Sequence, residues 1–419
     1  MNTKKLRIST LLLFGLMAMV ITSLVFMTGC KTIAYTPKDD AKTTVQELQS
    51  VVDANNRFTF DLYTQLAQDD KNTFFSPYSI SQAFVFPYEG ADGKTASELQ
   101  KTFYYPDDTT LRDGYARLGN ILNGAHEGYT LSTSNNIWVE KTMGLLPAYQ
   151  SIIGHYYAGT VQEADFKNAP EQMRIQINQR VTSETRGKIT DLMPQGSINP
   201  STRVVITNAI YFKGKWEHGF ESRNTRNAPF YLAPSNPVDT LMMHQTESFG
   251  YYEDDALQAI NLPYEGGEIS MMIILPKNDL TSITPQLSAE TVRAIESQMS
   301  SQKVQLSLPK FKFQTAYNDL VPTLETLGVH DAFSTTYADF SKMAREPLYI
   351  NVVVHKAYID VNEEGTEAAA ATGIGMMTSA AAPSTLKVFT ADHPFIFLIQ
   401  EKSTGEILFM GRVTDPRAQ

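Results

Sequence analysis

The sequence predicts an α+β fold built as one large domain. Amphipathic helical patterns dominate up to about residue 190, and short β-rich runs bounded by Pro, Gly and Asn follow after about residue 200. Hydrophobic residues make up 42% of the 419 residues, which is enough for a substantial core. No Pro/Gly/Ser-rich boundary divides the chain, so one domain is favoured over the two that its length suggests.

The N-terminal segment has the pattern of an export signal. Basic residues at positions 4–7 precede an apolar stretch at 11–27, which is shorter than the ~20 residues that a membrane-spanning helix needs. "MTGC" follows, and its Cys30 is the only cysteine; this resembles the lipidated cysteine of bacterial lipoproteins. We therefore expect a signal peptide over 1–29, lipidation at Cys30, and a polar tether over 30–50.

These features predict an exported lipoprotein on the outer membrane or cell surface, or one released from the cell. The lone cysteine leaves no disulfide, and 35 Lys+Arg against 45 Asp+Glu give a net charge of −10. Phosphate binding needs a basic face, and no basic cluster occurs in the body of the chain. Nucleic acid is therefore excluded as a partner.

Helices and strands are expected in the following places. Apolar residues recur at three and four over 43–68, Ser76-Pro77 suits a helix start, and another amphipathic helix begins at 170 and closes near Gly187. Strands are expected at 202–214, 269–276, 303–313, 348–361, 393–400 and 405–413. Several of these runs are apolar without alternation, which indicates strands buried on both faces.

No motif indicates an enzyme. "GADGKT" (90–95) lacks the first glycine of a phosphate-binding loop, because Tyr88 occupies that position. None of the seven histidines has metal-ligand spacing, and no G-x-S-x-G elbow occurs. The sequence predicts no catalytic residues, no metal and no cofactor.

From about residue 55 to 416 the chain resembles a serpin in many separate blocks. The blocks stand in family order and include "NTFFSPYSISQAF", "GADGKTASELQ", "SNNIWVE", "YYAGTVQEADF", "TRGKITDLMP", "TNAIYFKGKW", "LPKFKF", "LGVHDAF", "VVVHKAYIDVNEEGTEAAAAT", "DHPFIFLI" and "GEILFMGRV". The resemblance implies one domain over 51–419, about nine helices, three β-sheets, and an exposed reactive-centre loop at about 363–385. It also implies a monomer that inhibits proteases as a suicide substrate: the protease forms an acyl-enzyme, and the cut loop inserts into the main sheet.

The resemblance also assigns roles to residues outside the loop. Four match the polar cluster, called the shutter, beneath the opening sheet: Ser76, Ser79, Asn208 and His355. Three match the top of the sheet, called the breach, where Glu363 would pair with Lys310 beside Trp216. Ordinary helix capping, core hydrogen bonding or a surface ion pair would explain the same residues equally well.

The loop itself suits strand insertion. The expected hinge consists of Glu363, Glu364, Gly365, Thr366, Glu367, Ala368, Ala369, Ala370, Ala371 and Thr372. It contains no proline, as a central strand requires, and every second residue from Thr366 is small or uncharged, as a face that meets a core requires. A helix is the alternative for the alanine run, but Gly365, Gly373 and Gly375 would keep it short.

The bond that a protease would cut is placed by counting. The family's usual interval of about fourteen residues from Gly365 puts the cut between Ser379 and Ala380, with Met376, Met377 and Thr378 as alternatives. All are uncharged, and the loop has no Lys or Arg before Lys387. We expect elastase-, subtilisin- or chymotrypsin-like targets, with papain-like cysteine proteases as a further candidate class, and not trypsin. The alternative is a non-inhibitory serpin-fold binding or scaffold lipoprotein.

Overall fold

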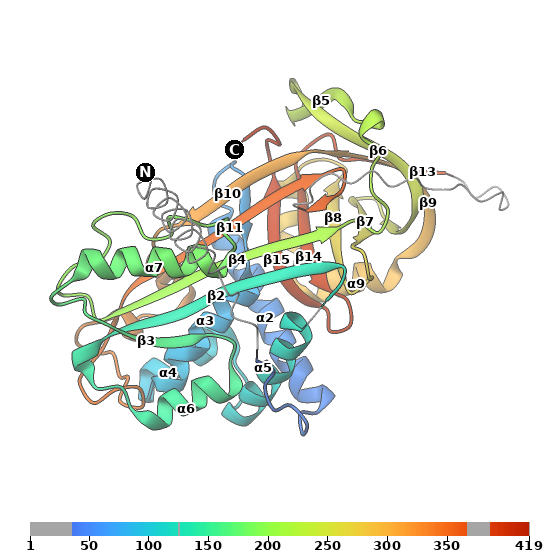
Figure 1. The fold of residues 1–419 in the computed structure, drawn as a ribbon. Helices are drawn as coiled ribbons and strands as arrows, with labels where there is room; N and C mark the ends of the chain where they lie inside the picture. The colour runs from blue at the N-terminus through green and yellow to red at the C-terminus, as the bar shows by residue number, and fades with distance from the viewer. Residues whose placement is uncertain (1–35, 125, 367–385, 419) are drawn as a thin grey trace, which may run out of the picture. The chain divides into compact units, whose positions relative to one another are not determined.

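The fold combines helices with two large β-sheets, as the sequence predicts (Figure 1). The computed structural model describes residues 36–418 except 125 and 367–385. The described residues contain nine α-helices: α2 (Val45–Leu66), α3 (Pro77–Gly90), α4 (Gly93–Phe103), α5 (Asp108–Asn123), α6 (Pro147–Tyr156), α7 (Pro170–Glu184), α8 (Leu280–Ile283), α9 (Ala289–Gln298) and α10 (Val321–Leu327). The α+β prediction is confirmed.

The strands pair into a six-stranded and a nine-stranded sheet. The six-stranded sheet has the order β10 (Phe311–Tyr317), β11 (Ile350–Asn362), β12 (Gly365–Thr366), β4 (Val204–Lys215), β2 (Tyr129–Glu140) and β3 (Thr160–Ala164). The nine-stranded sheet has the order β1 (Thr73–Phe75), β15 (Glu406–Val413), β14 (Phe395–Glu401), β8 (Ile269–Pro276), β7 (Leu257–Pro263), β6 (Asn236–Glu253), β9 (Ser300–Pro309) and β13 (Lys387–Thr390), with β5 (Arg226–Ala233) on β6.

Two hydrogen-bonded sheets therefore occur among the described strands where the resemblance implies three. The reason is the length of β6, which has 18 residues. Its first part pairs with β5 and its last part with β7, while β9 runs along most of it. Because β6 pairs with β5 at one end and with β7 at the other, the strands on either side of it belong to one continuous hydrogen-bonded sheet.

The predicted tether ends too late, and the domain start at 51 is wrong. Residue 51 lies inside α2, which begins after a capping box: Thr44 caps the backbone N–H of Glu47, and the Glu47 carboxylate accepts from the Thr44 N–H at 2.7 Å. Even before the helix, the Lys38 N–H donates to Asn120 Oδ1 at 2.8 Å. Residues 38–50 thus belong to the domain. The T-x-x-E pattern before Leu48 is the sequence signal for this start.

β2 is the most consequential of the strands that were not predicted. β2 lies within the early, helix-rich half of the chain, yet it is an interior strand of the six-stranded sheet and pairs with β4 over eleven residues. Its second half is buried on both faces and shows no alternation of polar and apolar residues. Polar residues such as Ser134, Asn135 and Asn136 fill buried positions there, which conceals the strand from a hydrophobicity pattern.

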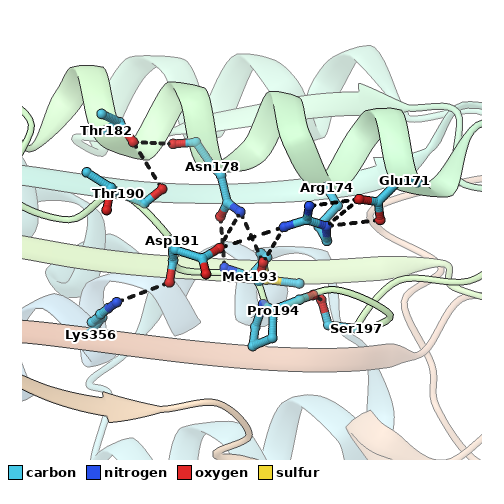
Figure 2. Close-up of polar contacts among 10 residues, drawn as sticks. All are labelled: Glu171, Arg174, Asn178, Thr182, Thr190, Asp191, Met193, Pro194, Ser197 and Lys356. Atoms are coloured by element: carbon cyan, nitrogen blue, oxygen red, sulfur yellow. Dashed lines mark hydrogen bonds and ion pairs between the residues drawn. The ribbon is translucent and has the colours of Figure 1, made fainter.

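Helix α7 covers one face of the six-stranded sheet through a small core. That core includes Ile177 and Val181 of α7 together with Trp138 of β2. The segment after the helix folds back beside it: the Arg174 guanidinium donates to the Met193 carbonyl at 2.8 Å (Figure 2). The Lys356 ammonium of β11 donates to the carbonyl of Asp191 at 3.1 Å, so this segment is tied to the sheet as well (Figure 2).

Candidate functional site

The candidate site is the place where β4 and β11 separate in the six-stranded sheet. These two strands are parallel neighbours, paired from Val204 and Ile350 as far as Tyr211 and Tyr358. Beyond that point β12 lies between them. The site is therefore a sheet whose central pair is closed along most of its length and already opened at one end.

β12 pairs with both neighbours at once. Thr366 lies opposite Val361 of β11 and opposite Gly214 of β4, both antiparallel. Gly365 makes the close approach possible: a Cβ built there would lie 2.0 Å from the Gly214 carbonyl oxygen, and its φ is +154°. Only glycine avoids this clash, which explains the glycine at the start of the expected hinge.

Thr366 faces the core from this position. It is 1% exposed, and its hydroxyl lies 2.6 Å from the hydroxyl of Tyr264, which is fully buried. The Tyr264 ring stacks on Trp216 with centroids 4.5 Å apart. The Trp216 indole N–H donates to the Asn362 carbonyl at 3.0 Å, so one aromatic pair contacts both sides of the hairpin. The inward orientation expected of Thr366 is present.

The ion pair expected at the top of the sheet is also present. The Lys310 ammonium lies 2.8 Å from Glu363 Oε2, and the Thr225 hydroxyl donates to Glu363 Oε1 at 2.9 Å. Burial disfavours the ionised carboxylate, but the hydrogen bonds from Lys310 and Thr225 outweigh it, so the pKa of Glu363 is lowered. The backbone N–H groups of Trp216 and Phe220 donate to the carbonyls of Glu364 and Glu363.

The four residues expected beneath the sheet lie in one buried network. Asn208 and His355 are register partners on β4 and β11, and their side chains are hydrogen-bonded. His355 Nε2 accepts from the Ser76 N–H at 3.1 Å, and Ser76 Oγ caps the Ser79 N–H of α3 at 3.2 Å. Asn208 donates to Ser79 Oγ at 2.6 Å, which closes the circuit. The network thus ties α3 to the two strands that would have to part.

Asn135 of β2 is a fifth member that sequence reasoning missed. Its Oδ1 accepts from Ser79 Oγ at 2.9 Å and from the Asn208 amide at 2.6 Å, and its own amide donates to Gln82 at 2.6 Å. Tyr264 was missed in the same way. Asn135 stands in the quoted block "SNNIWVE", so the signal was a polar pair inside a β-like run.

His355 makes this network sensitive to acid. Burial lowers the pKa of His355 to about 3, although the hydrogen bond to Asn208 opposes the shift. The folded protein thus keeps His355 neutral. The stability that the neutral His355 side chain contributes is fully present above pH 6.5. It is lost as the pH falls from 6.5 toward about 3, at up to ~1.4 kcal/mol per pH unit.

Replacing His355 with asparagine should reveal this dependence. We expect H355N to melt at a lower temperature than the unmodified protein at neutral pH, because Ser76 and Asn208 lose a partner. We expect the difference to shrink as pH falls from 6.5 toward about 3, since the variant has no buried imidazole to protonate. Melting temperatures across this range at one heating rate test the prediction, and parallel curves for the two proteins would contradict it.

The remaining expected residues lie outside the described ones. They are Cys30, the hinge residues Glu367 to Thr372, and the candidate bond residues Met376, Met377, Thr378, Ser379 and Ala380. Within the described ranges, no group of three or more His, Cys, Asp or Glu side chains is placed to hold a metal ion. None of the helices that the structure describes combines the length and apolarity needed to cross a membrane.

A profile of a known family matches the chain over this whole arrangement. The family described as "Serpin (serine protease inhibitor)" matches residues 53–416. The chain belongs to the serpin family. The sheet that opens at β12 is therefore that of a serpin; Thr366, the last described residue before the gap at 367–385, lies on β12, and Leu386, the first after it, precedes β13.

Curated serpins and solved serpin structures resemble the chain along nearly its full length. An uncharacterised serpin-like protein of Thermococcus kodakarensis is 42% identical over 88% of this chain and 86% of its own. Human leukocyte elastase inhibitor is 37% identical over 88% of this chain and all of its own. Serpin48 of the insect Tenebrio molitor, described as a highly specific serpin, is 32% identical, with a TM-score of 0.78 over 89% of this chain and 99% of its own.

Proposed function

We propose that this serpin is an irreversible suicide-substrate inhibitor of serine proteases. The observation that carries the proposal is the position of β12, two residues of the loop already paired between β4 and β11. A strand that starts to insert at one end needs only to continue. The similarity to leukocyte elastase inhibitor supports an elastase-like target.

The covalent step follows the ordinary chemistry of serine proteases. The protease serine Oγ attacks the carbonyl carbon of the bait residue, an ester forms, and the C–N bond to the next residue breaks. The new amine takes its proton from the protease histidine. The loop N-terminal to the cut is then free to insert, and it moves the attached protease away before water can hydrolyse the ester.

The observed register states where each inserted residue would lie. Because Thr366 pairs with Gly214, every further residue pairs one step lower on β4, and Met376 would reach Val204, where β4 begins. On the other side the same register brings residue 377 to Ile350, where β11 begins. The insertable length of the sheet thus ends at 376–377.

This register supports a bond beyond Met377. A protease attached at Met376 would have to fit inside the sheet, whereas Thr378 or Ser379 would lie just past its end. We therefore keep Ser379–Ala380 as the proposed bond, with Thr378 as the alternative that the register supports equally. The uncharged candidates fit elastase-, subtilisin- or chymotrypsin-like proteases.

The same register gives a purpose to the polar cluster under the sheet. Thr372 would arrive directly between Asn208 and His355, which now bond to each other. Its hydroxyl both donates and accepts, so it could bridge the two side chains that its strand separates. Breaking the Asn208–His355 bond is therefore offset in the inserted state.

The location of the protein remains an expectation from its first thirty residues. We propose that lipidation at Cys30 anchors the chain to a bacterial membrane, where it meets external proteases as a monomer. Metabolic labelling with a palmitate analogue should label the protein with its natural sequence and should not label a Cys30→Ala variant. Equal labelling of both would contradict this location.

One experiment separates inhibition from the alternative, a serpin fold used only for binding or scaffolding. The mature chain is incubated with pancreatic or neutrophil elastase, subtilisin and trypsin, and the products are analysed on denaturing gels and by mass spectrometry. We expect a covalent complex with elastase or subtilisin that survives boiling, and one cut within 376–380. Cleavage without a complex, and without a rise in melting temperature, would favour the binding role. A stable trypsin complex would contradict the proposed specificity.

A further inference from the structure

The first described residues of the chain are fastened to two helices. The Lys38 N–H donates to Asn120 Oδ1 at 2.8 Å, and the Asn120 amide donates to the Lys38 carbonyl at 2.8 Å. The Lys38 ammonium also donates to the Gly154 carbonyl of α6 at 2.8 Å. The Arg117 guanidinium of α5 donates to the Thr43 carbonyl at 2.8 Å. These bonds fix the point at which the chain leaves the domain toward its N-terminus.

This exit point lies on one side of the six-stranded sheet. Helices α5 and α6 contact each other, and α6 is followed directly along the chain by β3, which also contacts it. β3 is one edge of the sheet, and β10 is the opposite edge (Figure 1). The chain therefore leaves the domain on the β3 side, away from β10.

The tether between the exit point and the expected lipid is short. Lys38 lies eight residues after Cys30, and such a segment spans at most ~26–29 Å when fully extended. A domain of about 380 residues has a radius of gyration of ~21 Å and hence an outer radius of ~27 Å. A domain held by a tether about as long as its own radius cannot turn its opposite side toward the anchoring surface. The side that carries the exit point must face that surface.

The charges on this side permit close approach to a membrane. Helix α6 contains no Lys, Arg, Asp or Glu, and no acidic residue occurs from 141 to 162, although the whole chain has a net charge of −10. Residues 38–42 balance two lysines with two aspartates. Anionic lipids repel carboxylates, so a surface without net negative charge can approach them at little electrostatic cost.

We propose that the side formed by α5 and α6 faces the surface of an anionic phospholipid bilayer, held there by the eight-residue tether, while β10 points away. This proposal rests on the lipidation of Cys30 proposed above. The sequence alone suggests a longer tether, over 30–50, which would leave the domain free to turn. The bonds of Lys38 and Thr43 shorten it and thereby set the orientation.

This orientation suits the proposed inhibition. β12 lies between β4 and β11 in the interior of the sheet, so the bilayer would not cover the position at which insertion begins. The inserting strand would run along β4 and β11, roughly across the line from β3 to β10. On average the attached protease would thus be carried along the bilayer and not into it.

Energy transfer from the protein to the bilayer tests the orientation. Cys30 is the only cysteine, so the mature chain, made without its signal peptide, couples there to a maleimide lipid in vesicles of phosphatidylcholine and phosphatidylglycerol. An azide-bearing amino acid replaces either Ser151 of α6 or Gln314 of β10, both exposed, and receives a donor dye. With an acceptor on a lipid headgroup, we expect at least about twofold more transfer from position 151 than from 314. Equal transfer, or more from 314, would overturn the proposal.

A lengthened tether is the matched control. Inserting about 24 Gly and Ser residues between Ala34 and Tyr35 raises the root-mean-square tether length from ~16 Å to ~31 Å, and its full extension then exceeds the width of the domain. We expect the difference between the two positions to shrink, and an unchanged difference would overturn the tether as its cause. Gln150 and Ala316, also exposed, replace the two positions if a dye disturbs folding.

The design separates this proposal from the one on which it rests. Maleimide coupling supplies the anchor chemically, so the transfer measurement reports orientation alone, whereas palmitate labelling reports lipidation in the cell. A chain that shows the expected transfer but no palmitate label would contradict lipidation only. A labelled chain with equal transfer from both positions would contradict the orientation only.

Discussion

Replacing Thr366 with arginine is expected to reduce the yield of covalent protease complex by about a hundredfold or more. Thr366 is 1% exposed, and its side chain faces Tyr264 in the core between β4 and β11. An arginine there either buries an unpaired cation, at several kcal/mol, or keeps β12 out of the sheet. The protease should still cut the loop, so gels should show cleaved serpin in place of complex.

Two variants serve as controls for T366R. Leu386→Arg adds the same charge at an exposed position, 49% exposed, at the other end of the loop, and it should form complex normally. Thr366→Val keeps the volume but leaves the Tyr264 hydroxyl without its partner, so it should lose complex only by up to about tenfold. A normal complex yield from T366R would refute insertion from β12.

Replacing Glu406 with glutamine is expected to make the native protein more resistant to heat at mildly alkaline pH, by a margin that grows as the pH rises from 4.5 toward the pKa of Glu406 in the folded protein. Glu406 is fully buried. Its Oε1 accepts a hydrogen bond from the Asn55 amide at 3.1 Å, whereas its Oε2 has no partner among the described residues. Burial first, and then the charges of Glu401 and Asp53, raise the pKa of Glu406 well above 4.5.

The pH dependence of this effect has a definite sign. The pKa of Glu406 is higher in the folded protein than the value of 4.5 expected in the unfolded chain. Below pH 4.5 the carboxyl is protonated in both states and costs no stability. As the pH rises from 4.5 toward the pKa in the folded protein, the free energy of unfolding falls. The loss is at most ~1.4 kcal/mol per pH unit. E406Q has no proton to lose and should show a flatter profile. Melting at one heating rate from pH 4.5 upward measures both curves, and Glu247→Gln, at an exposed position, serves as the control. Equal slopes in the unmodified protein and E406Q would show that Glu406 carries no such cost.

Several elements were predictable because their residues report a local environment. The run at 269–276 is apolar except for Ser270, and it forms β8 with the same bounds, buried at every position. Ser76 before Pro77 indicated a helix start, and Ser76 caps α3. In each case burial or capping acts on neighbouring residues, so the sequence carries the signal directly.

The parts that escaped prediction depend on contacts between distant residues. Asn135 joins Ser79 and Asn208 only because β2 lies beside β4 and above α3. Tyr264 stands in a turn region whose sequence gives no reason to expect contact with Thr366, 102 residues away. Glu363 and Lys310 were predicted to form an ion pair, but only from the family resemblance, because the sequence around each residue gives no sign of contact with the other.

β12 has a kinetic consequence that its two residues do not suggest. Each residue that enters between β4 and β11 replaces one residue pair of the β4–β11 pairing with two new pairs, one to each strand. The number of backbone hydrogen bonds therefore rises as insertion proceeds. The costly first step, opening a closed sheet to admit a foreign strand, is already complete in the resting protein. Insertion should therefore need no separate nucleation step. We expect strand pairing to propagate in one direction from β12, at a rate set by how fast β4 and β11 separate.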